Sequence, residues 1–483
     1  MFDHLKRLLK GSAIYGLGSA LNQGLALMLL PLFTSYLTPT DYGIISVLSL
    51  WSTLMITLFS LGIGVSFGLA YYDSVFEQDD VIWTALIILF LSSGIMLTLN
   101  IIFSKEISLF LLKSSNLKSY IIIYAFISLF SILINLFTLI FQLKEKQAAF
   151  VLSTTITSLL SIFLSIFLIV FLKYGVWGRL IALFLSTFIS FCFLLFQINC
   201  KPKLIFNIKT INFLINKGII VLPSFFAIYI LQQGNTYIIQ HFSGLEQAGL
   251  YAIGFNFGNG MNMLIQAFSL AWLPFAMSLK DKPEEAAYTI GKISTYYIMI
   301  IGVTTLLFFI YAKPLIMVFT QPQFFMAFQI IGLSALSFFL VGLFNIINIE
   351  SYLAQELRPT IIIQIISSLI FIWASLQLTQ KYQSWGASLS LVIGYFLIIL
   401  LLFTWNKRQK NRVIKIKYEK KSIYILILYI LFIFNNQIQP IDFNFQSFFF
   451  DHLLLVFILI FQYYSLDLNE KSKIKYYLKK ISF

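Results

Sequence analysis

The sequence has 483 residues, of which 59% are hydrophobic and only 11% are charged, with 52 phenylalanines. Soluble domains carry about 25% charged residues, so this composition excludes a soluble globular protein and predicts an all-α integral membrane protein. A net charge of +14 would suggest nucleic-acid binding in a soluble protein, but here the basic residues lie in short segments between apolar runs, and we expect no nucleic-acid partner.

The chain begins with a basic segment that leads into a long apolar run. Because this run has no small-residue cleavage site, we interpret it as the first membrane helix and not as a signal peptide. A spanning helix needs about 20 apolar residues, and runs of this kind predict fourteen spans, the thirteenth of which is short. The spans lie near residues 11–36, 43–70, 81–103, 119–141, 149–172, 179–198, 218–240, 248–278, 293–312, 323–347, 359–379, 386–405, 422–436 and 452–466.

Lys and Arg residues are distributed unequally over the two sides that these spans define. With both termini in the cytoplasm, 26 of the 33 Lys and Arg residues lie on the cytoplasmic side and 7 on the outer side. Cytoplasmic loops of membrane proteins are enriched in Lys and Arg, so the bias favours this orientation. We expect a multi-pass protein of the bacterial cytoplasmic (inner) membrane.

Three features recur at a nearly constant distance along the chain. KYGVWG (173–178) and KYQSWG (381–386) are 208 residues apart, and the glycines of the two turns that end at Gly43 and Gly249 are 206 apart. The third pair, KEKQAAF (144–150) and QELRPTI (355–361), is about 211 apart. These distances predict two parallel six-helix repeats, a lobe over 1–205 and a lobe over 206–408, with an appended segment over 409–483 that holds two more helices.

The KYGVWG and KYQSWG sequences are predicted to be tight outer turns, each leading into the last helix of its half. A glycine eases the bend, and the tyrosine and tryptophan lie at the membrane interface. Two six-helix bundles that face each other leave a cleft between them, which is the architecture of an alternating-access transporter.

The order of these features resembles that of a known family. The turn TPTDYG (38–43), the stretch GLYAIGFNFGNGMNMLIQAFSLAWLPFAMSL (249–279) and the two KYxxWG turns are similar to the Wzx-type polysaccharide repeat-unit (O-antigen) flippases of the MATE-like (MOP) superfamily. The resemblance covers the whole chain. It departs from the family at Asn235, where an aspartate is often found, and at Tyr71 and Tyr72, where an arginine often ends the second helix.

The resemblance implies a substrate, partners and a pathway. The protein would move an undecaprenyl-diphosphate-linked oligosaccharide between the leaflets for O-antigen or capsule synthesis. Its partners would be this lipid-linked oligosaccharide, membrane lipids and a polysaccharide polymerase with its chain-length regulator. A drug or metabolite exporter of the same superfamily is the first alternative, and a membrane-embedded polymerase or ligase is the second.

Polar residues inside the predicted spans are candidates for the substrate cavity, because burying them in lipid is costly. Four amides in the eighth span share a 120° arc of the helix, and similar residues occur in the first, seventh and tenth spans. Lining of a cavity that binds sugar hydroxyls and hydrogen bonding between helices both explain them. The candidates are Asn22, Gln23, Gln232, Gln233, Asn235, Asn256, Asn259, Asn262, Gln266, Asn345 and Asn348.

A diphosphate requires cations, and no Lys or Arg lies deep in a predicted span. Candidates at helix ends are Lys10, Arg179, Lys217 and Arg358, although positive-inside topology and lipid contact also explain them. No phosphate-binding loop for ATP is present, and three scattered histidines predict no metal site. We therefore expect a transporter without catalytic residues, cofactor or metal.

Overall fold

The structure is a computed structural model that describes residues 24, 28–73, 75–144, 147–197, 207–279, 282–353, 358–409, 416–438, 445–467 and 471–472. Within these ranges the regular elements are helices, and no residue there lies in a β-strand. The prediction of an all-α membrane protein is confirmed. Lys10, Asn22 and Gln23 lie outside the described residues.

The first half of the chain forms helices of very different lengths. They are α2 (Leu30–Thr34), α3 (Pro39–Phe59), α4 (Ile63–Tyr72), α5 (Gln78–Ile102), α6 (Ser104–Leu112), η1 (Ser115–Leu117), α7 (Lys118–Leu143), α8 (Gln147–Ser165), the π-helix η2 (Ile166–Phe171) and α9 (Gly175–Gln197).

The second half contains two helices of 51 residues each, α10 and α15. Its elements are α10 (Ile208–Gly258), α11 (Gly260–Ser278), α12 (Pro283–Ile310), α13 (Ala312–Phe319), η3 (Pro322–Ala327), α14 (Phe328–Leu353), α15 (Arg358–Arg408), α16 (Lys420–Ile438) and α17 (Phe445–Ser465).

Both 51-residue helices fold back on themselves. In α15, the side chain of Phe371 packs against Gly394, which would lie about 34 Å away along a straight helix. In α10, the Asn235 amide reaches the Tyr251 hydroxyl at 3.3 Å across the non-helical residue Gly244. Each is therefore a helical hairpin. The two arms of α15 match two predicted spans, whereas the second arm of α10 covers only the start of the predicted span over 248–278, which continues in α11.

Eight helices of the described residues are long and apolar enough to cross a membrane, or nine if the bent α10 counts as one span. A multi-pass membrane protein is thus shown. The helix α15 passes this test as one helix although it has two arms, so the number of helices is not the number of spans. The number fourteen stays a prediction.

The two KYxxWG turns share an unusual backbone conformation. Gly175 has a φ of 55° and Gln383, at the equivalent position 208 residues later, has a φ of 50°. A positive φ is free for glycine but strained for glutamine. The shared glycines, Gly178 and Gly386, have a different role, because each packs against a backbone carbonyl of the preceding helix. The bend therefore lies at the third residue of the motif, whereas the shared glycine allows close packing.

The TPTDYG turn starts α3 by capping its N-terminus. The Thr38 hydroxyl accepts a hydrogen bond from the Asp41 backbone N–H at 3.2 Å, and the Asp41 carboxylate accepts from the Thr38 N–H at 2.8 Å. This reciprocal capping box, with Pro39 at the first helical position, explains why the helix begins here.

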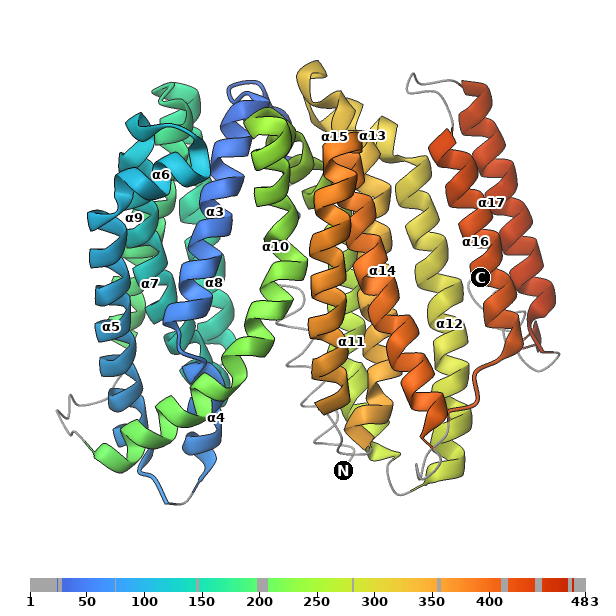
Figure 1. Ribbon diagram of the computed structural model, residues 1–483, viewed down its shortest axis with the longest axis horizontal. Coiled ribbons are helices and arrows are strands. Elements are labelled where there is room, and N and C mark those ends of the chain that lie inside the picture. The colour runs from blue at the N-terminus through green and yellow to red at the C-terminus, as the bar shows by residue number, and fades with distance from the viewer. Residues whose placement is uncertain are drawn as a thin grey trace.

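The helices form two groups with α10 running diagonally between them (Figure 1). Helices α3 to α9 lie on one side and α11 to α17 on the other, and α10 packs against α3 and α4 as well as α14 and α15. The largest apolar core belongs to the second group and a separate one fills the first. The proposed lobe boundaries, at 205 and 408, remain a prediction that this arrangement fits.

The appended helices α16 and α17 attach to the second group through α12. The Tyr429 hydroxyl donates to the Ile298 carbonyl at 3.0 Å and accepts from the Gln462 amide at 2.6 Å. Gly302 makes room for the Tyr429 ring, which contacts its backbone. This contact fixes α16 against α12 by packing and hydrogen bonding together.

Candidate functional site

A cavity of about 550 Å³ lies between the first helix group and α10. Neutral polar side chains from both sides line it, and no Asp, Glu, Lys or Arg is among its lining residues in the described part of the chain. The lining consists of Thr53, Ile56, Thr57, Ser60, Gly62, Gly64, Val65, Leu89, Ile132, Asn135, Leu136, Thr138, Leu139, Gln142, Phe225, Ile228, Tyr229, Gln232 and Gln233.

Four amides of this lining, Asn135, Gln142, Gln232 and Gln233, hold their hydrogen-bonding groups available for a ligand. Within the described residues none of their side chains makes a hydrogen bond to the protein. Each amide offers two donors and an acceptor. We call these four residues the cavity amides.

The hydroxyl groups of the cavity complement the amides. The Thr53 and Thr57 hydroxyls donate to carbonyls of their own helix at 2.9 and 2.8 Å, and the Thr138 hydroxyl does so at 2.9 Å. Their oxygen lone pairs remain open toward the cavity as acceptors. The cavity therefore presents neutral donors and acceptors, which suit the hydroxyl groups of a sugar.

Two contacts between α10 and the α3–α4 segment bracket this cavity. The Tyr229 hydroxyl donates to the Leu50 carbonyl at 3.0 Å. Further along, the backbones at Gly62 and Gly218 touch, so closely that a methyl group on Gly62 would overlap the Gly218 carbonyl and one on Gly218 would overlap the Leu61 carbonyl. Opening the cavity at these ends requires α10 to move away from α3 and α4.

Sequence reasoning identified Gln232 and Gln233 as cavity candidates but not Asn135 or Gln142. A signal was present, because Asn135, Thr138 and Gln142 are three and four residues apart and share one face of α7. Thr53, Thr57 and Ser60 have the same kind of spacing. Polar residues on one face of an otherwise apolar span are the pattern that finds them.

Asn235, another candidate, is hydrogen-bonded to the second arm of α10 and to α15. Its amide donates to the Ala387 carbonyl at 2.7 Å and to Tyr251, and its oxygen accepts from Ser375 at 2.7 Å and from Ser390 at 3.3 Å. Only 1% of the residue is exposed. This saturated amide joins both arms of α10 to both arms of α15, which favours a packing role.

The candidates of the tenth span also have protein partners. The Asn345 amide donates to the Ser269 hydroxyl at 2.9 Å, and the buried Asn348 accepts from Thr360 at 3.0 Å. They join α14 to α11 and α15.

The four amides of the predicted eighth span lie in two consecutive helices. Asn256 and Asn259 lie at the end of α10, and Asn262 and Gln266 follow in α11. Asn256 and Gln266 are exposed and the other two are half-buried. Within the described residues their side chains make no hydrogen bond, yet they do not line the cavity above.

The three candidate cations that the structure describes occupy different places. Lys217 is exposed and adjoins Gly218, at the bracketing contact of the cavity, and Arg358 is exposed as the first residue of α15. Arg179 is half-buried, donates to the Ser165 hydroxyl at 2.7 Å and lies within electrostatic range of Tyr42 and Tyr124. Ser165 ends α8 where the π-helix begins, and such bulges are frequent at functional sites.

The described part of the chain contains no group of three or more His, Cys, Asp or Glu side chains that could hold a metal ion.

Residues 8–280, more than half of the chain, match the model of the family described as polysaccharide biosynthesis protein. The chain belongs to this family. No curated protein matches the chain. The resemblance to polysaccharide flippases of the MATE-like superfamily is thus confirmed at the level of the family, and solved structures test it at the level of the fold.

Two solved structures with the same fold are a flippase and a transporter by their own titles. The lipid II flippase MurJ in an inward closed conformation is 15% identical, with a TM-score of 0.67 over 94% of this chain and 97% of that chain. An inward-facing multidrug resistance MATE family transporter of the MOP superfamily is 14% identical, with a TM-score of 0.68 over 80% of this chain and 93% of that chain. The polysaccharide biosynthesis protein described here therefore has the MOP fold.

Proposed function

We propose that the protein is a flippase that moves undecaprenyl-diphosphate-linked oligosaccharide repeat units across the bacterial cytoplasmic membrane for surface polysaccharide synthesis, O-antigen or capsule. Membership of the polysaccharide biosynthesis family gives the pathway, and the fold is that of transporters. The observation that carries the proposal is the uncharged cavity with its four available amides between α10 and the first helix group.

The oligosaccharide occupies the cavity in this proposal. Sugar hydroxyls both donate and accept hydrogen bonds, and Asn135, Gln142, Gln232 and Gln233 do the same from opposite walls. Amides from both walls let one sugar chain bridge the first helix group and α10. The amides Asn256, Asn259, Asn262 and Gln266, which the sequence predicts on one face and of which Asn256 and Gln266 are exposed, are proposed to meet the sugar in another stage of the cycle.

The diphosphate is assigned to cations at the ends of the helices. Lys217 and Arg358, on the cytoplasmic side of the predicted topology, would receive the head group at entry. Arg179, at the opposite end, would hold it at exit, because its described partners are neutral and leave its charge available for an anion.

Transport is proposed to proceed by alternating access between the lobe over 1–205 and the lobe over 206–408. The helix α10 is the element that changes partners, since it packs on both groups and closes the cavity at Tyr229 and Gly218. Both termini lie in the cytoplasm in this proposal, as the distribution of Lys and Arg predicts.

A drug exporter of the same fold is the main alternative, because one neighbour is a multidrug transporter by its title. A cationic drug favours a carboxylate in its site, and the described lining of the cavity has none. Glu350, the acidic residue nearest to a predicted span core, is buried and accepts a hydrogen bond from the Tyr418 hydroxyl at 3.1 Å.

A deletion strain tests the proposal. We expect loss of surface polysaccharide, with single lipid-linked repeat units accumulating in the inner leaflet. Intact polysaccharide with reduced dye efflux would support the exporter instead. Single units that reach the outer leaflet without being polymerised would point to the polymerase or ligase alternative.

A further inference from the structure

The α10 wall of the cavity between the first helix group and α10 is partly aromatic. On this helix the lining residues are Phe225, Ile228, Tyr229, Gln232 and Gln233. Their spacing is that of a single face of an α-helix, with neighbours three or four positions apart. The face is divided along its length, because the two aromatic side chains lie toward one end and the two amides lie at the other.

Two contacts hold the ring of Tyr229 in position. Its hydroxyl donates to the Leu50 carbonyl at 3.0 Å, and its ring stacks on that of Phe226, with the ring centres 6.2 Å apart and the planes inclined by 22°. Because the O–H is engaged by a backbone carbonyl, Tyr229 presents its ring to the cavity that it lines. A ring that is already oriented loses little freedom when a ligand packs on it.

Phe225 and the amides lie at suitable distances on either side of Tyr229. Phe225, one turn earlier, is 37% exposed and also lines the cavity. With a rise of 1.5 Å per residue, Phe225 and Gln233 each lie about 6 Å from Tyr229 along the helix axis. A sugar residue that packs on the Tyr229 ring is therefore within reach of an amide at its edge.

A pyranose ring is amphipathic in the same sense as this helix face. Its hydroxyls project from the edge, whereas C–H groups cover a ring face wherever no axial hydroxyl interrupts it. These C–H groups carry partial positive charge and pack on the electron-rich face of an aromatic ring. The hydroxyls at the edge pair with the donors and acceptor of an amide.

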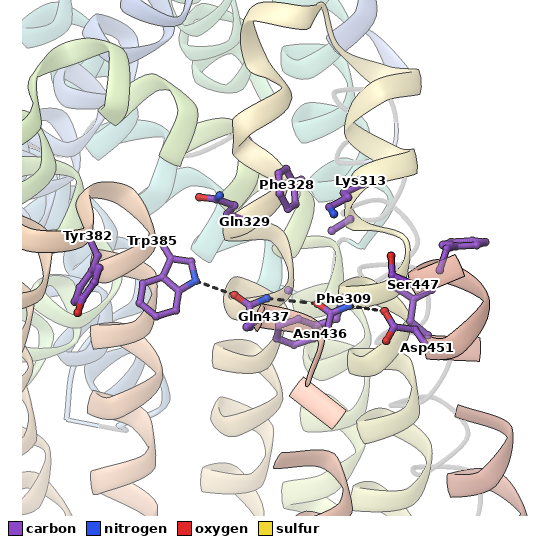
Figure 2. A pocket seen from close by; sticks show the side chains of 14 residues that line it. Phe309, Lys313, Phe328, Gln329, Tyr382, Trp385, Asn436, Gln437, Ser447 and Asp451 are labelled. Atoms are coloured by element: carbon purple, nitrogen blue, oxygen red, sulfur yellow. Dashed lines mark hydrogen bonds between the residues drawn. The ribbon is translucent and has the colours of Figure 1, made fainter. Parts of the chain in front are cut away.

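A second cavity also combines aromatic and amide side chains, but its amides are engaged within the protein. It has a volume of about 370 Å³ and lies between the second helix group and the appended helices (Figure 2). There the Trp385 indole N–H donates to Gln437 at 2.8 Å, Gln437 donates to Asn436 at 3.5 Å, and Asn436 donates to Asp451 at 2.8 Å. The cavity amides make no such bonds within the described residues, which favours the first cavity as the sugar site.

We propose that Tyr229 and Phe225 form an aromatic platform on which a pyranose residue of the oligosaccharide stacks by its C–H face. Gln232 and Gln233 bind the hydroxyls at the edge of the same residue. The platform rests on the proposed function, since it requires the oligosaccharide to occupy this cavity. It adds a specificity to that function, because the cavity then favours a repeat unit that contains a sugar residue with an uninterrupted C–H face.

The test compares the binding of two lipids to the purified full-length protein. One is undecaprenyl diphosphate, and the other is undecaprenyl diphosphate linked to a trisaccharide of β-glucose, whose hydroxyls are equatorial and leave both ring faces to C–H groups. The ratio of the two dissociation constants isolates the contribution of the sugar. Tyr229→Leu and Phe225→Leu should each lower this ratio, by about tenfold for Tyr229→Leu, while the affinity for undecaprenyl diphosphate stays unchanged.

Tyr229→Phe separates the ring from the hydroxyl. It removes the hydrogen bond to the Leu50 carbonyl but keeps the ring, so the ratio should stay within about twofold of the wild-type value although the unfolding temperature falls. Phe196→Leu, which removes an aromatic side chain that is 86% exposed on α9, is the control. It should change neither the ratio nor the unfolding temperature.

The same measurements contain the results that would overturn the platform. A wild-type ratio in a folded Tyr229→Leu protein would do so, and so would equal losses in Tyr229→Leu and Tyr229→Phe, because the hydroxyl would then be responsible. If Tyr229→Leu does not fold, a wild-type ratio in Phe225→Leu overturns the platform. Equal binding of the two lipids by the wild-type protein would instead contradict the proposed function, and the platform with it.

Discussion

Gly43 and Gly249, 206 residues apart, make the same contact in opposite directions. A methyl group on Gly43 would overlap the carbonyl of Leu245, and one on Gly249 would overlap the carbonyl of Pro39. Leu245 and Pro39 are also 206 residues apart. Exchanging the two halves of the chain therefore replaces Gly43 by Gly249 and Leu245 by Pro39, which turns the first contact into the second. This is the contact expected where a two-fold axis relates two repeats, and it supports the proposed duplication.

Valine at either glycine should therefore have nearly the same effect. Because backbone atoms fill the space, Gly43→Val and Gly249→Val should each lower the free energy of unfolding by about 1–3 kcal/mol. Thermal unfolding of the purified proteins measures this. Gly94→Val is the control, since no atom lies within 4 Å of a side chain added there. A Gly43→Val protein as stable as the control would contradict the close contact.

The cavity amides and Asn235 should respond differently to leucine. Asn135→Leu with Gln233→Leu removes available amides, so export of repeat units should fall about tenfold while thermal stability changes little. Asn235→Leu removes an amide with four protein partners and should lower stability by about 1–3 kcal/mol or more. Export and thermal unfolding would be measured on the wild-type protein, the double variant and the Asn235→Leu protein. Normal export by a stable double variant would show that the cavity amides do not bind the oligosaccharide.

The amide face that continues from α10 into α11 is tested by the double variant Asn259→Leu with Gln266→Leu. Since neither side chain has a described hydrogen bond to the protein, the fold should tolerate the change. We expect a clear loss of polysaccharide export at an unchanged level of protein in the membrane. Full export would mean that this face contacts lipid or another helix and not the sugar.

Arg179→Gln should separate stability from transport. The guanidinium has neutral described partners, so its removal breaks no ion pair and should leave the unfolding temperature unchanged or raised. Export should fall because the proposed diphosphate contact is lost. Lys381→Gln, which removes an exposed charge, is the control. Loss of stability in Arg179→Gln together with normal export would show that the arginine serves only the fold.

Several of these features could be predicted from the sequence because they depend on local or periodic signals. Hydropathy gives the fold class, and the KYxxWG motif recurs because both copies form the same turn, with a positive φ at Gly175 and at Gln383. The sequence alone did not show that the third residue makes this bend, because one copy has glycine there and the other has glutamine.

The sequence could not show which amides are hydrogen-bonded within the protein and which line the cavity. Asn235 and Gln233 are two residues apart in one helix, yet three of the four partners of Asn235 lie 140 to 155 residues further along the chain, at Ser375, Ala387 and Ser390. Only the packing of α15 against α10 decides that one amide is saturated and its neighbour lines a cavity. Helical spacing could identify Asn135 and Gln142, but it could not tell that α10 faces them.

The central claim is that this cavity carries a lipid-linked oligosaccharide across the membrane. The most direct test is translocation of a fluorescent undecaprenyl-diphosphate oligosaccharide in proteoliposomes that contain the purified full-length protein. The account predicts translocation by the wild-type protein and a rate about tenfold lower for the Asn135→Leu and Gln233→Leu double variant. No translocation by the folded wild-type protein, together with transport of a cationic dye, would contradict it.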